Sequence, residues 1–266
     1  MPLVDSLDDP RLALYRNLKD HELARQGGRF IAEGEQVVRR LLASDIRVES
    51  VLVSQRKAEI IAPLVSADVP VWIASDAVIQ KVIGFQFHSG VMAVGVRPAP
   101  ADLSTIVGRP GDRQTLVVCP KITNTQNLGS LIRLCAGFGV DGLVLGPSCC
   151  DPFYRHCVRI SMGSVFRLPI TRSSDLHRDL LDLRQRWNFQ LIASVISDDA
   201  EPLARAARPA RLGILFGNEA DGLAREEIVL CDRRVTIPMR MGTDSLNVAV
   251  AAGIFLHHFL DGCEEK

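Results

Sequence analysis

Polar residues and glycines collect in three stretches of this chain, and each stretch lies beside apolar elements. The stretches are NTQNLGSLIRLCAGFG (residues 124–139), LFGNEADGLARE (215–226) and GTDSLN (242–247). Unsatisfied polar groups are costly when they lie between apolar elements. Each stretch therefore either caps a helix or binds something polar.

The first stretch combines amide groups with an arginine at the start of a predicted helix. Asn127 and Gly129 lie at the junction of loop and helix, and helix N-termini attract anions. Arg133 lies among apolar neighbours farther along the same helix. Its guanidinium group either reaches out to solvent or forms a planar fork for a phosphate or carboxylate. The residues alone leave both interpretations open.

The other two stretches also have a binding and a structural interpretation. Gly217-Asn218-Glu219 follows an apolar run directly, and glycine there permits a tight turn close to a ligand. Glu219 could instead favour a helix N-terminus. Ser245 or Asp244 could cap the last helix, and Asn247 could satisfy loop backbone. Familiar alternatives are missing, because the chain has no G-x-G-x-x-G, Walker A or G-x-S-x-G motif.

The elements that must position these stretches alternate between strand and helix from about residue 114 onward. The predicted strands are 115–119, 142–146, 166–170, 189–195, 211–217 and 233–239, and the predicted helices lie near 128–138, 152–161, 174–186, 222–230 and 246–260. Strands that are continuously apolar belong to a sheet covered on both faces, and the alternation predicts a mostly parallel sheet. We expect ligands at the carboxyl ends of its strands.

The first hundred residues predict a separate, smaller α/β domain. Its predicted strands are 29–34, 48–54, 70–75 and 90–96, and its helices begin at Pro10 (to about Asp20), Glu35 (to Ala43), Arg56 and near Val78. Proline and glycine are dense at 97–100 and again at 108–111, which is typical of a linker. The predicted organisation is a domain over 1–98, a linker over 99–113 and a second domain over 114–266.

Composition limits the function classes. The 266 residues hold 31 basic and 31 acidic side chains, so net charge gives no support to a general binder of polyanions. Basic residues are in excess only locally, and the set Arg11, Arg16, Lys19, Arg25 and Arg29 is either a solvated helix face or an RNA contact.

The chain shows no secretory signal and no apolar run near the ~20 residues of a membrane span. We therefore expect a cytoplasmic protein with no membrane association. Seven cysteines is an odd number, which favours reduced thiols. The one cluster, Cys149, Cys150, His156 and Cys157, lacks the paired Cys-x-x-Cys spacing of structural zinc, so no metal is expected.

Taken together, the three stretches resemble the SpoU/TrmH family of RNA ribose 2′-O-methyltransferases in the SPOUT superfamily. The resemblance rests on N-x-G-x-x-x-R followed by F-G, then G-N-E-x-x-G-L, then I-P-M…S-L-N-V-A-V-A-A, in this order over residues ~114 to 260. FIAEGEQVVRRLLAS and FHSGVMAVGV in the first region resemble the ribosomal-protein-like substrate-binding domain of many members. Many members have Asp-Pro before the first-motif asparagine, whereas this chain has Asn124-Thr125-Gln126.

This resemblance implies a trefoil knot in the second domain, and the knot loops bind S-adenosylmethionine. Motif matching places cofactor contacts at Gly217, Asn218, Ile237, Met239, Ser245 and Leu246. The helix from Asn247 to Phe259 would pack within the knot and against a second subunit, because family members are typically homodimers. A knot is an exception to the rule against threaded connections, so periodicity does not predict it.

For catalysis, the resemblance points to Asn127, Arg133, Glu219, Ser245 and Asn247. In the implied reaction, a ribose 2′-hydroxyl of rRNA or tRNA attacks the methyl carbon of S-adenosylmethionine. Arginine is effectively always protonated, so we interpret Arg133 as a phosphate clamp, and Glu219 could hold Arg133 or a backbone amide. Two alternatives are a non-catalytic RNA-binding or ribosome-assembly protein on this fold and a SPOUT enzyme that methylates a base nitrogen. The full set of five polar residues favours the ribose methyltransferase.

Overall fold

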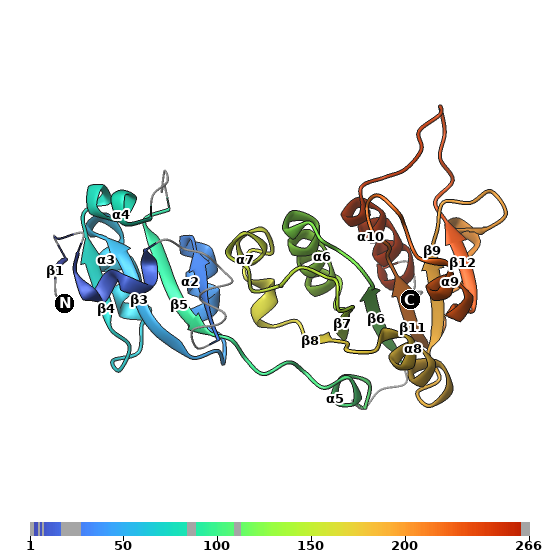
Figure 1. The fold of residues 1–266 in the computed structure, drawn as a ribbon, viewed down its shortest axis with the longest axis horizontal. Coiled ribbons are helices and arrows are strands. Elements are labelled where there is room, and N and C mark those ends of the chain that lie inside the picture. The colour runs from blue at the N-terminus through green and yellow to red at the C-terminus, as the bar shows by residue number, and fades with distance from the viewer. Residues whose placement is uncertain are drawn as a thin grey trace. The chain divides into compact units, whose positions relative to one another are not determined.

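The chain divides into two compact units. The structure, a computed structural model, describes residues 3–4, 6, 8–16, 28–83, 89–108 and 113–261. Unit 1 comprises Met1–Ala99 together with Asp151–Arg167, and unit 2 comprises Pro100–Cys150 together with Leu168–Lys266. Figure 1 labels most of the helices and strands of both units.

Unit 1 is built on a mixed five-stranded sheet with the order β1-β4-β3-β5-β2. Strand β5 is antiparallel to β2 and β3, whereas β4 is parallel to β1 and β3. The strands are β1 Leu3–Val4, β2 Arg29–Glu33, β3 Val48–Ser54, β4 Val71–Ala74 and β5 Val91–Val96. The helices are η1 Pro10–Tyr15, α2 Glu35–Leu42, α3 Gln55–Ile61, η2 Ala62–Leu64, α4 Asp76–Ile83, α7 Arg155–Ile160 and η3 Ser164–Phe166.

The predicted helix at Pro10 exists but is shorter and tighter than expected. Asp9 caps it by accepting a hydrogen bond from the Arg11 amide, and the 3₁₀ helix η1 ends at Tyr15. Residues 17–20 of the prediction lie outside the described residues. Tyr15 is fully buried and its hydroxyl lies 2.8 Å from Ser50 Oγ, so the Tyr15 side chain anchors η1.

Segment 151–167 belongs to unit 1, although its position in the sequence placed it in the second predicted domain. The ring of Phe30 in β2 packs against Phe153 and Phe166, with centroid distances of 5.0 and 5.7 Å. Arg97 forms an ion pair with Asp151. Helical periodicity predicts that a segment has an apolar face but not the sheet against which that face packs. This explains why the sequence assigned segment 151–167 to the wrong domain.

Unit 2 contains a seven-stranded sheet with the order β10-β12-β9-β11-β6-β7-β8, in which every neighbouring pair is parallel. The strands are β6 Gln114–Cys119, β7 Gly142–Leu145, β8 Ile170–Arg172, β9 Gln190–Ser194, β10 Glu201–Pro202, β11 Arg211–Leu215 and β12 Arg233–Thr236. The helices are α5 Leu103–Val107, α6 Thr125–Gly137, α8 Leu176–Gln185, α9 Arg225–Leu230, α10 Val248–Leu256, and the short turns η4 Leu203–Arg205 and η5 His257–Asp261. The predicted fold class, a mostly parallel α/β domain with a smaller N-terminal α/β domain, is confirmed.

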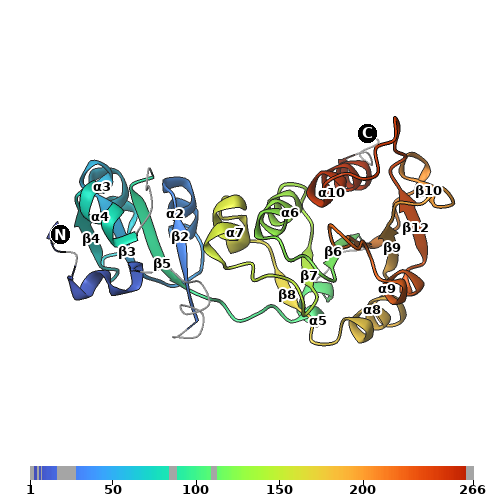
Figure 2. The ribbon, with the colours of Figure 1, turned by 45° about the horizontal axis from the view of Figure 1, so that its top comes forward.

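Helices cover both faces of this sheet. Figure 2 shows α6 and α10 on one face and α5, α8 and α9 on the other. The strands of the second face bury Leu116, Val118 and Leu191 against α5, α8 and α9. Coverage on both faces explains why the strands are apolar at consecutive positions.

Three elements of unit 2 differ from the predictions. The predicted strand 166–170 is instead the end of η3 followed by the short strand β8 from Ile170, and β10 was not predicted. The predicted linker contains α5, whose Ile106 and Val107 are buried in the core of unit 2. Asp102 caps α5 by accepting from the Ser104 amide at 2.8 Å. The predicted linker is therefore in part a short helix of unit 2, and its residues 109–112 lie outside the described residues.

The C-terminal helix returns across the sheet. β12 lies near one edge of the sheet, yet α10, which follows it, packs against α6 beyond the central strands. The connecting loop, residues 237–247, projects from the unit in Figure 1. This return is what a knotted domain requires, and the knot stays a prediction. In the part of the chain that is described, every helix is too short or too polar to span a membrane.

Candidate active site

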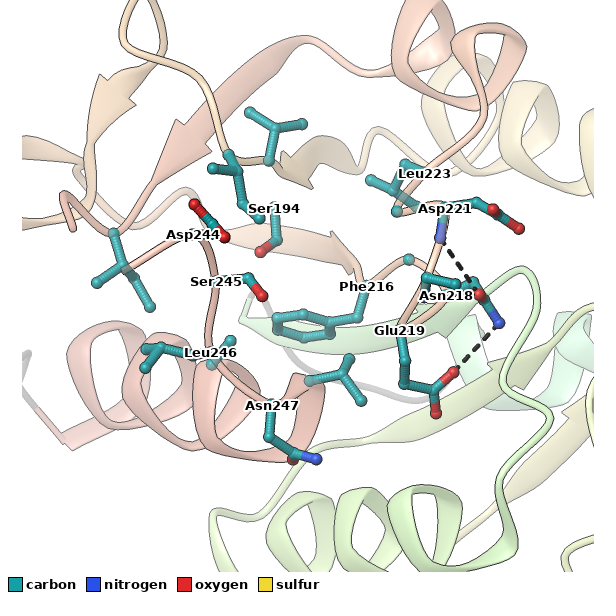
Figure 3. Close-up of a pocket in the computed structure, with 18 of the residues that line it drawn as sticks. Ser194, Phe216, Asn218, Glu219, Asp221, Leu223, Asp244, Ser245, Leu246 and Asn247 are labelled. Carbon is teal, nitrogen blue, oxygen red and sulfur yellow. Dashed lines mark hydrogen bonds between the residues drawn. The ribbon is translucent and has the colours of Figure 1, made fainter. Parts of the chain in front are cut away.

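A cavity of about 540 Å³ opens where the second and third polar stretches meet. Its walls come from residues 194–196 at the end of β9, residues 216–223 after β11, and residues 237–248, which lead into α10. Figure 3 shows side chains from these three segments around Phe216. β9 and β11 are neighbouring parallel strands, so the cavity lies at the carboxyl ends of strands, as predicted.

The loop after β11 is shaped by glycines. A Cβ atom added to Gly217 would lie 2.2 Å from the backbone carbon of Gly222, so no other residue fits at position 217 without displacing the backbone. Asn218 and Gly222 exchange two backbone hydrogen bonds of 2.9 Å, and Gly222 has a φ of 70°. The result is a tight loop that presents Asn218 and Glu219 at the cavity.

A chain of side-chain hydrogen bonds joins all three polar stretches. Asn247 Nδ2 donates to Asn127 Oδ1 at 2.9 Å, and Asn127 Nδ2 donates to Glu219 Oε1 at 2.6 Å. Asn218 Nδ2 completes the chain by donating to Glu219 Oε2 at 3.1 Å. Asn127 comes from α6, Glu219 from the loop after β11 and Asn247 from the start of α10. The site is therefore a hydrogen-bonded junction of three segments.

Two asparagines of the polar stretches cap helices, and one of them, Asn247, also takes part in this junction. Asn247, not Ser245 or Asp244, is the N-cap of α10, because its Oδ1 accepts from the Ala249 amide at 2.9 Å. The structural interpretation of Ser245 and Asp244 as caps is thus wrong. Both are exposed and line the cavity. Asn124 caps α6 in the same way, accepting from the Gln126 amide at 2.8 Å.

Arg133 lies apart from this junction within one chain. It is an exposed residue of α6, it is not among the residues lining the cavity, and its guanidinium group forms no hydrogen bond or ion pair with any described residue. The suggested contact between Glu219 and Arg133 is absent from the described part of the chain, because the Glu219 oxygens accept from Asn127 and Asn218. A side chain held out toward solvent is available to a ligand that approaches from outside.

All six predicted cofactor contacts line the cavity, namely Gly217, Asn218, Ile237, Met239, Ser245 and Leu246. The structure adds lining residues that the sequence did not single out. Ser194 is the last residue of β9, Val195 and Ile196 follow it, and Phe216 directly follows β11. Phe216 packs edge-on against Phe255 of α10 with a centroid distance of 5.6 Å. Position at the carboxyl end of a predicted strand was the one signal that could have identified them.

The cysteines form no metal site in the described residues. No group of three or more His, Cys, Asp or Glu side chains lies close enough there to hold an ion. Cys149 Sγ donates instead to the Cys119 carbonyl at 3.0 Å. Burial raises the pKa of Cys119, and it raises the pKa of Cys135 to about 12, so both thiols stay protonated at neutral pH.

Two family models match the chain. The SpoU rRNA Methylase family covers residues 114–257, and the RNA 2′-O ribose methyltransferase substrate-binding domain covers residues 31–100. The first match contains all three stretches of the cavity and the second contains most of the unit 1 sheet.

Known relatives agree with these models. An uncharacterized tRNA/rRNA methyltransferase of Mycobacterium tuberculosis is 36% identical over 256 residues, covering 93% of this chain and 87% of the relative. A 23S rRNA (guanosine-2′-O-)-methyltransferase of Acinetobacter baylyi is 26% identical, covering 73% of this chain and 77% of the relative.

Solved structures share the fold along nearly the whole chain. The AdoMet-bound rRNA methyltransferase of Sinorhizobium meliloti has a TM-score of 0.79 at 25% identity, covering 97% of this chain and 96% of that one. The AviRb methyltransferase of Streptomyces viridochromogenes, at 23% identity, has a TM-score of 0.79 with 96% and 98% covered, and shows likeness of fold. With a family model over more than half of its length and a relative 36% identical over 93% of it, this chain belongs to the SpoU rRNA methylase family.

Proposed function

We propose that this protein transfers a methyl group from S-adenosylmethionine to a ribose 2′-hydroxyl of rRNA or tRNA. The observation that carries the proposal is the hydrogen-bonded junction of Asn127, Glu219 and Asn247 beside the 540 Å³ cavity. The three residues come from the three family motifs, and the junction brings them together at the carboxyl edge of the sheet. The base-nitrogen alternative lacks a comparable observation.

The cavity fits S-adenosylmethionine in its chemistry. Phe216, Leu223 and Ile237 offer apolar walls for the adenosine part, and Gly217 lets backbone groups approach closely. Asp244 and Ser245 add polar groups that suit the charged amino-acid part. When bound, the cofactor supplies an electrophilic methyl carbon. The cofactor contacts are therefore proposed at Gly217, Asn218, Ile237, Met239, Ser245 and Leu246.

The chain's own residues have to position the ribose and bind the negatively charged phosphate beside it. Asn127 and Asn247 are themselves held by hydrogen bonds, so their amide groups are preorganised to orient the substrate and the cofactor. Arg133 is exposed, and a guanidinium group matches a phosphate bidentately. We assign it the role of a clamp on the phosphate beside the target ribose. The group that accepts the hydroxyl proton stays unassigned.

A second subunit would complete this arrangement. Val250 and Ile254 of α10 are 53% and 40% exposed, although they are apolar and lie one helical turn apart. Their exposure supports a homodimer in which α10 packs against the partner. Arg133 would then act in the setting of the dimer, which accounts for its distance from the junction within one chain. Since ribosomal and transfer RNAs are the proposed substrates, the proposed location is the cytoplasm.

The test is methyl transfer from labelled S-adenosylmethionine to separate pools of undermodified rRNA and tRNA, followed by digestion to nucleosides. A labelled 2′-O-methyl nucleoside in one pool establishes the reaction and the RNA class. A labelled base would favour the nitrogen-methylating alternative. RNA binding without label and without cofactor binding by calorimetry would favour a non-catalytic RNA binder. The Arg133→Ala protein serves as the inactive control.

A further inference from the structure

Helix α2 and segment 151–167 of unit 1 carry four arginines, two of which pair with one buried carboxylate. Arg155 and Arg159 of α7 lie 3.4 and 3.5 Å from the two oxygens of Glu33. Arg40 of α2 donates a hydrogen bond to the carbonyl of Met162, just beyond α7. Arg167 follows η3 in the same segment. We call Arg40, Arg155, Arg159 and Arg167 the arginine cluster.

Three of the four arginines present positive charge to solvent. Arg159 is 51% exposed, and Arg40 and Arg167 are also exposed. Arg159 shares Glu33 with Arg155, and the Glu33 side chain is only 9% exposed. Arg40 and Arg167 have no ion pair in the described part of the chain. Arg40, Arg159 and Arg167 therefore leave a positive surface in a protein whose net charge is zero.

The backbone beneath the cluster is held rigidly. Met162 and Gly163 both have positive φ angles, 54° and 79°, and the Gly163 amide donates to the Val158 carbonyl at 3.2 Å. This reversal turns the Met162 carbonyl toward Arg40. A Cβ atom on Gly163 would lie 3.3 Å from Arg40 Cβ, so α2 packs tightly on the turn. A non-glycine residue in this conformation requires support from its surroundings, and rigid placement lowers the entropic cost of binding.

The basic residues at the N-terminus are less suited to bind an anion. Arg11 forms an ion pair with Asp9, Arg16 donates to the Asp9 carbonyl at 2.7 Å, and Arg29 lies 2.6 Å from Glu49. Lys19 and Arg25 lie outside the described residues. The charges of Arg11 and Arg29 are already matched by carboxylates, so the hypothesis of an RNA contact is better placed at the arginine cluster.

We propose that the arginine cluster binds the phosphate backbone of the RNA substrate. The proposal rests on the proposed function for the identity of the RNA. Guanidinium groups bind phosphate oxygens in a planar, bidentate manner, and such contacts fix the position of the nucleic acid without reading its sequence. The cluster joins α2 of the predicted substrate-binding domain to segment 151–167, so one RNA strand would contact both parts of unit 1.

The test compares RNA affinity of the full-length protein after single substitutions. Arg167→Ala removes a charge that has no ion pair, and Arg159→Ala removes one of two partners of Glu33. The controls are Arg47→Ala and Arg56→Ala, which remove exposed arginines of unit 1 at 74% and 72% exposure that pair with Glu49 and Asp76. Affinity for the rRNA or tRNA pool is measured by fluorescence anisotropy over a series of salt concentrations.

We expect each cluster variant to bind RNA roughly 3- to 10-fold more weakly and to reduce the salt slope by about 0.7 to 1, the value of one phosphate contact. KM for RNA should rise with kcat nearly unchanged, while cofactor affinity by calorimetry stays the same. Compared with Arg159→Ala, Arg159→Lys should restore part of the RNA affinity because it keeps the positive charge. A merely structural loss would not explain that recovery.

Equal affinity and equal salt slope in the cluster and control variants would overturn the proposal. The proposed function would survive that result, since methyl transfer by the unaltered protein tests it separately. Conversely, RNA binding that depends on the cluster in a protein without methyl transfer would overturn the proposed activity and leave the binding surface in place.

Discussion

Asn247 Nδ2 donates a hydrogen bond of 2.9 Å to Asn127 Oδ1, although the two residues are 120 positions apart. The same Asn247 side chain caps α10 through its oxygen, and Asn127 passes the connection to Glu219. One amide therefore fixes the start of the last helix and the geometry of the site. Fold stability and site geometry are coupled at this residue.

Replacing Asn247 should lower both stability and activity. In Asn247→Ala, α10 loses its N-cap and Asn127 loses its donor. We expect a loss of about 1 kcal/mol in the free energy of unfolding, the usual cost of removing such a cap, measured by urea denaturation. In Asn247→Ser the hydroxyl can still cap, so stability should largely recover while kcat stays low. Full recovery of kcat in the serine variant would contradict a role for the Asn247–Asn127 bond.

Gly217→Ala should abolish cofactor binding. The added methyl group would meet the Gly222 backbone at 2.2 Å, so the loop that shapes the cavity has to move. Calorimetry with S-adenosylmethionine should show at least a tenfold loss of affinity. Gly137→Ala is the matched control, because nothing lies within 4 Å of its added Cβ. An unchanged cofactor affinity in Gly217→Ala would place the cofactor elsewhere.

Arg133→Ala should abolish turnover and leave cofactor affinity nearly intact. Arg133 is exposed and is not among the residues lining the cavity, so its loss removes a substrate contact and not a cofactor contact. Arg133→Lys keeps the charge but not the planar fork, and we expect it to restore only a small part of kcat/KM. Both are measured with the RNA pool that accepts the methyl group. A loss of cofactor affinity as large as the loss of activity would contradict the clamp.

Thiol labelling should distinguish buried from accessible cysteines. Burial raises the pKa of Cys119 and of Cys135, and a higher pKa means less reactive thiolate at any given pH. At pH 8, iodoacetamide should leave Cys119 and Cys135 unlabelled and, among the cysteines that the structure describes, modify the half-buried Cys150 first, as read by peptide mass spectrometry. All should react in 8 M urea. Fast labelling of Cys119 in the folded protein would show that β6 opens locally.

Glu35 should make stability depend on pH in the acid range. Hydrogen bonds from Lys57 at 2.8 Å and Arg39 at 3.1 Å lower the pKa of Glu35 below its usual 4.5. The folded state therefore binds this proton less tightly than the unfolded state, and the stabilisation is present above pH 4.5 and lost as the pH falls below it. Glu35→Gln should lower the urea midpoint at pH 7 and have less effect at pH 3.

The matched control is Glu59→Gln in α3, an exposed glutamate without an ion pair in the described part of the chain. Its urea midpoint should equal that of the unaltered protein at both pH values. An effect of Glu35→Gln that is equally large at pH 3 and pH 7 would assign its role to packing and not to charge.

The sequence by itself predicted most of the secondary structure and the three motif residues that meet at the junction. Apolar periodicity predicted the longer strands of both sheets, because burial on one or both faces leaves a pattern in the residues. The motif spacing identified Asn127, Glu219 and Asn247 as a set, since a family keeps its site chemistry at fixed positions. Short elements such as β10 and η3 carry too few residues to leave such a pattern.

The tertiary structure alone decided which residues meet. Capping by Asn247 instead of Ser245 depends on where the last helix begins, and several neighbouring side chains could have capped it. The placement of 151–167 on the Phe30 face of unit 1, and with it the arginine cluster, depends on packing between segments more than a hundred residues apart. Local sequence specifies an apolar or charged face, but the partner of that face is set by long-range packing, which no local pattern contains.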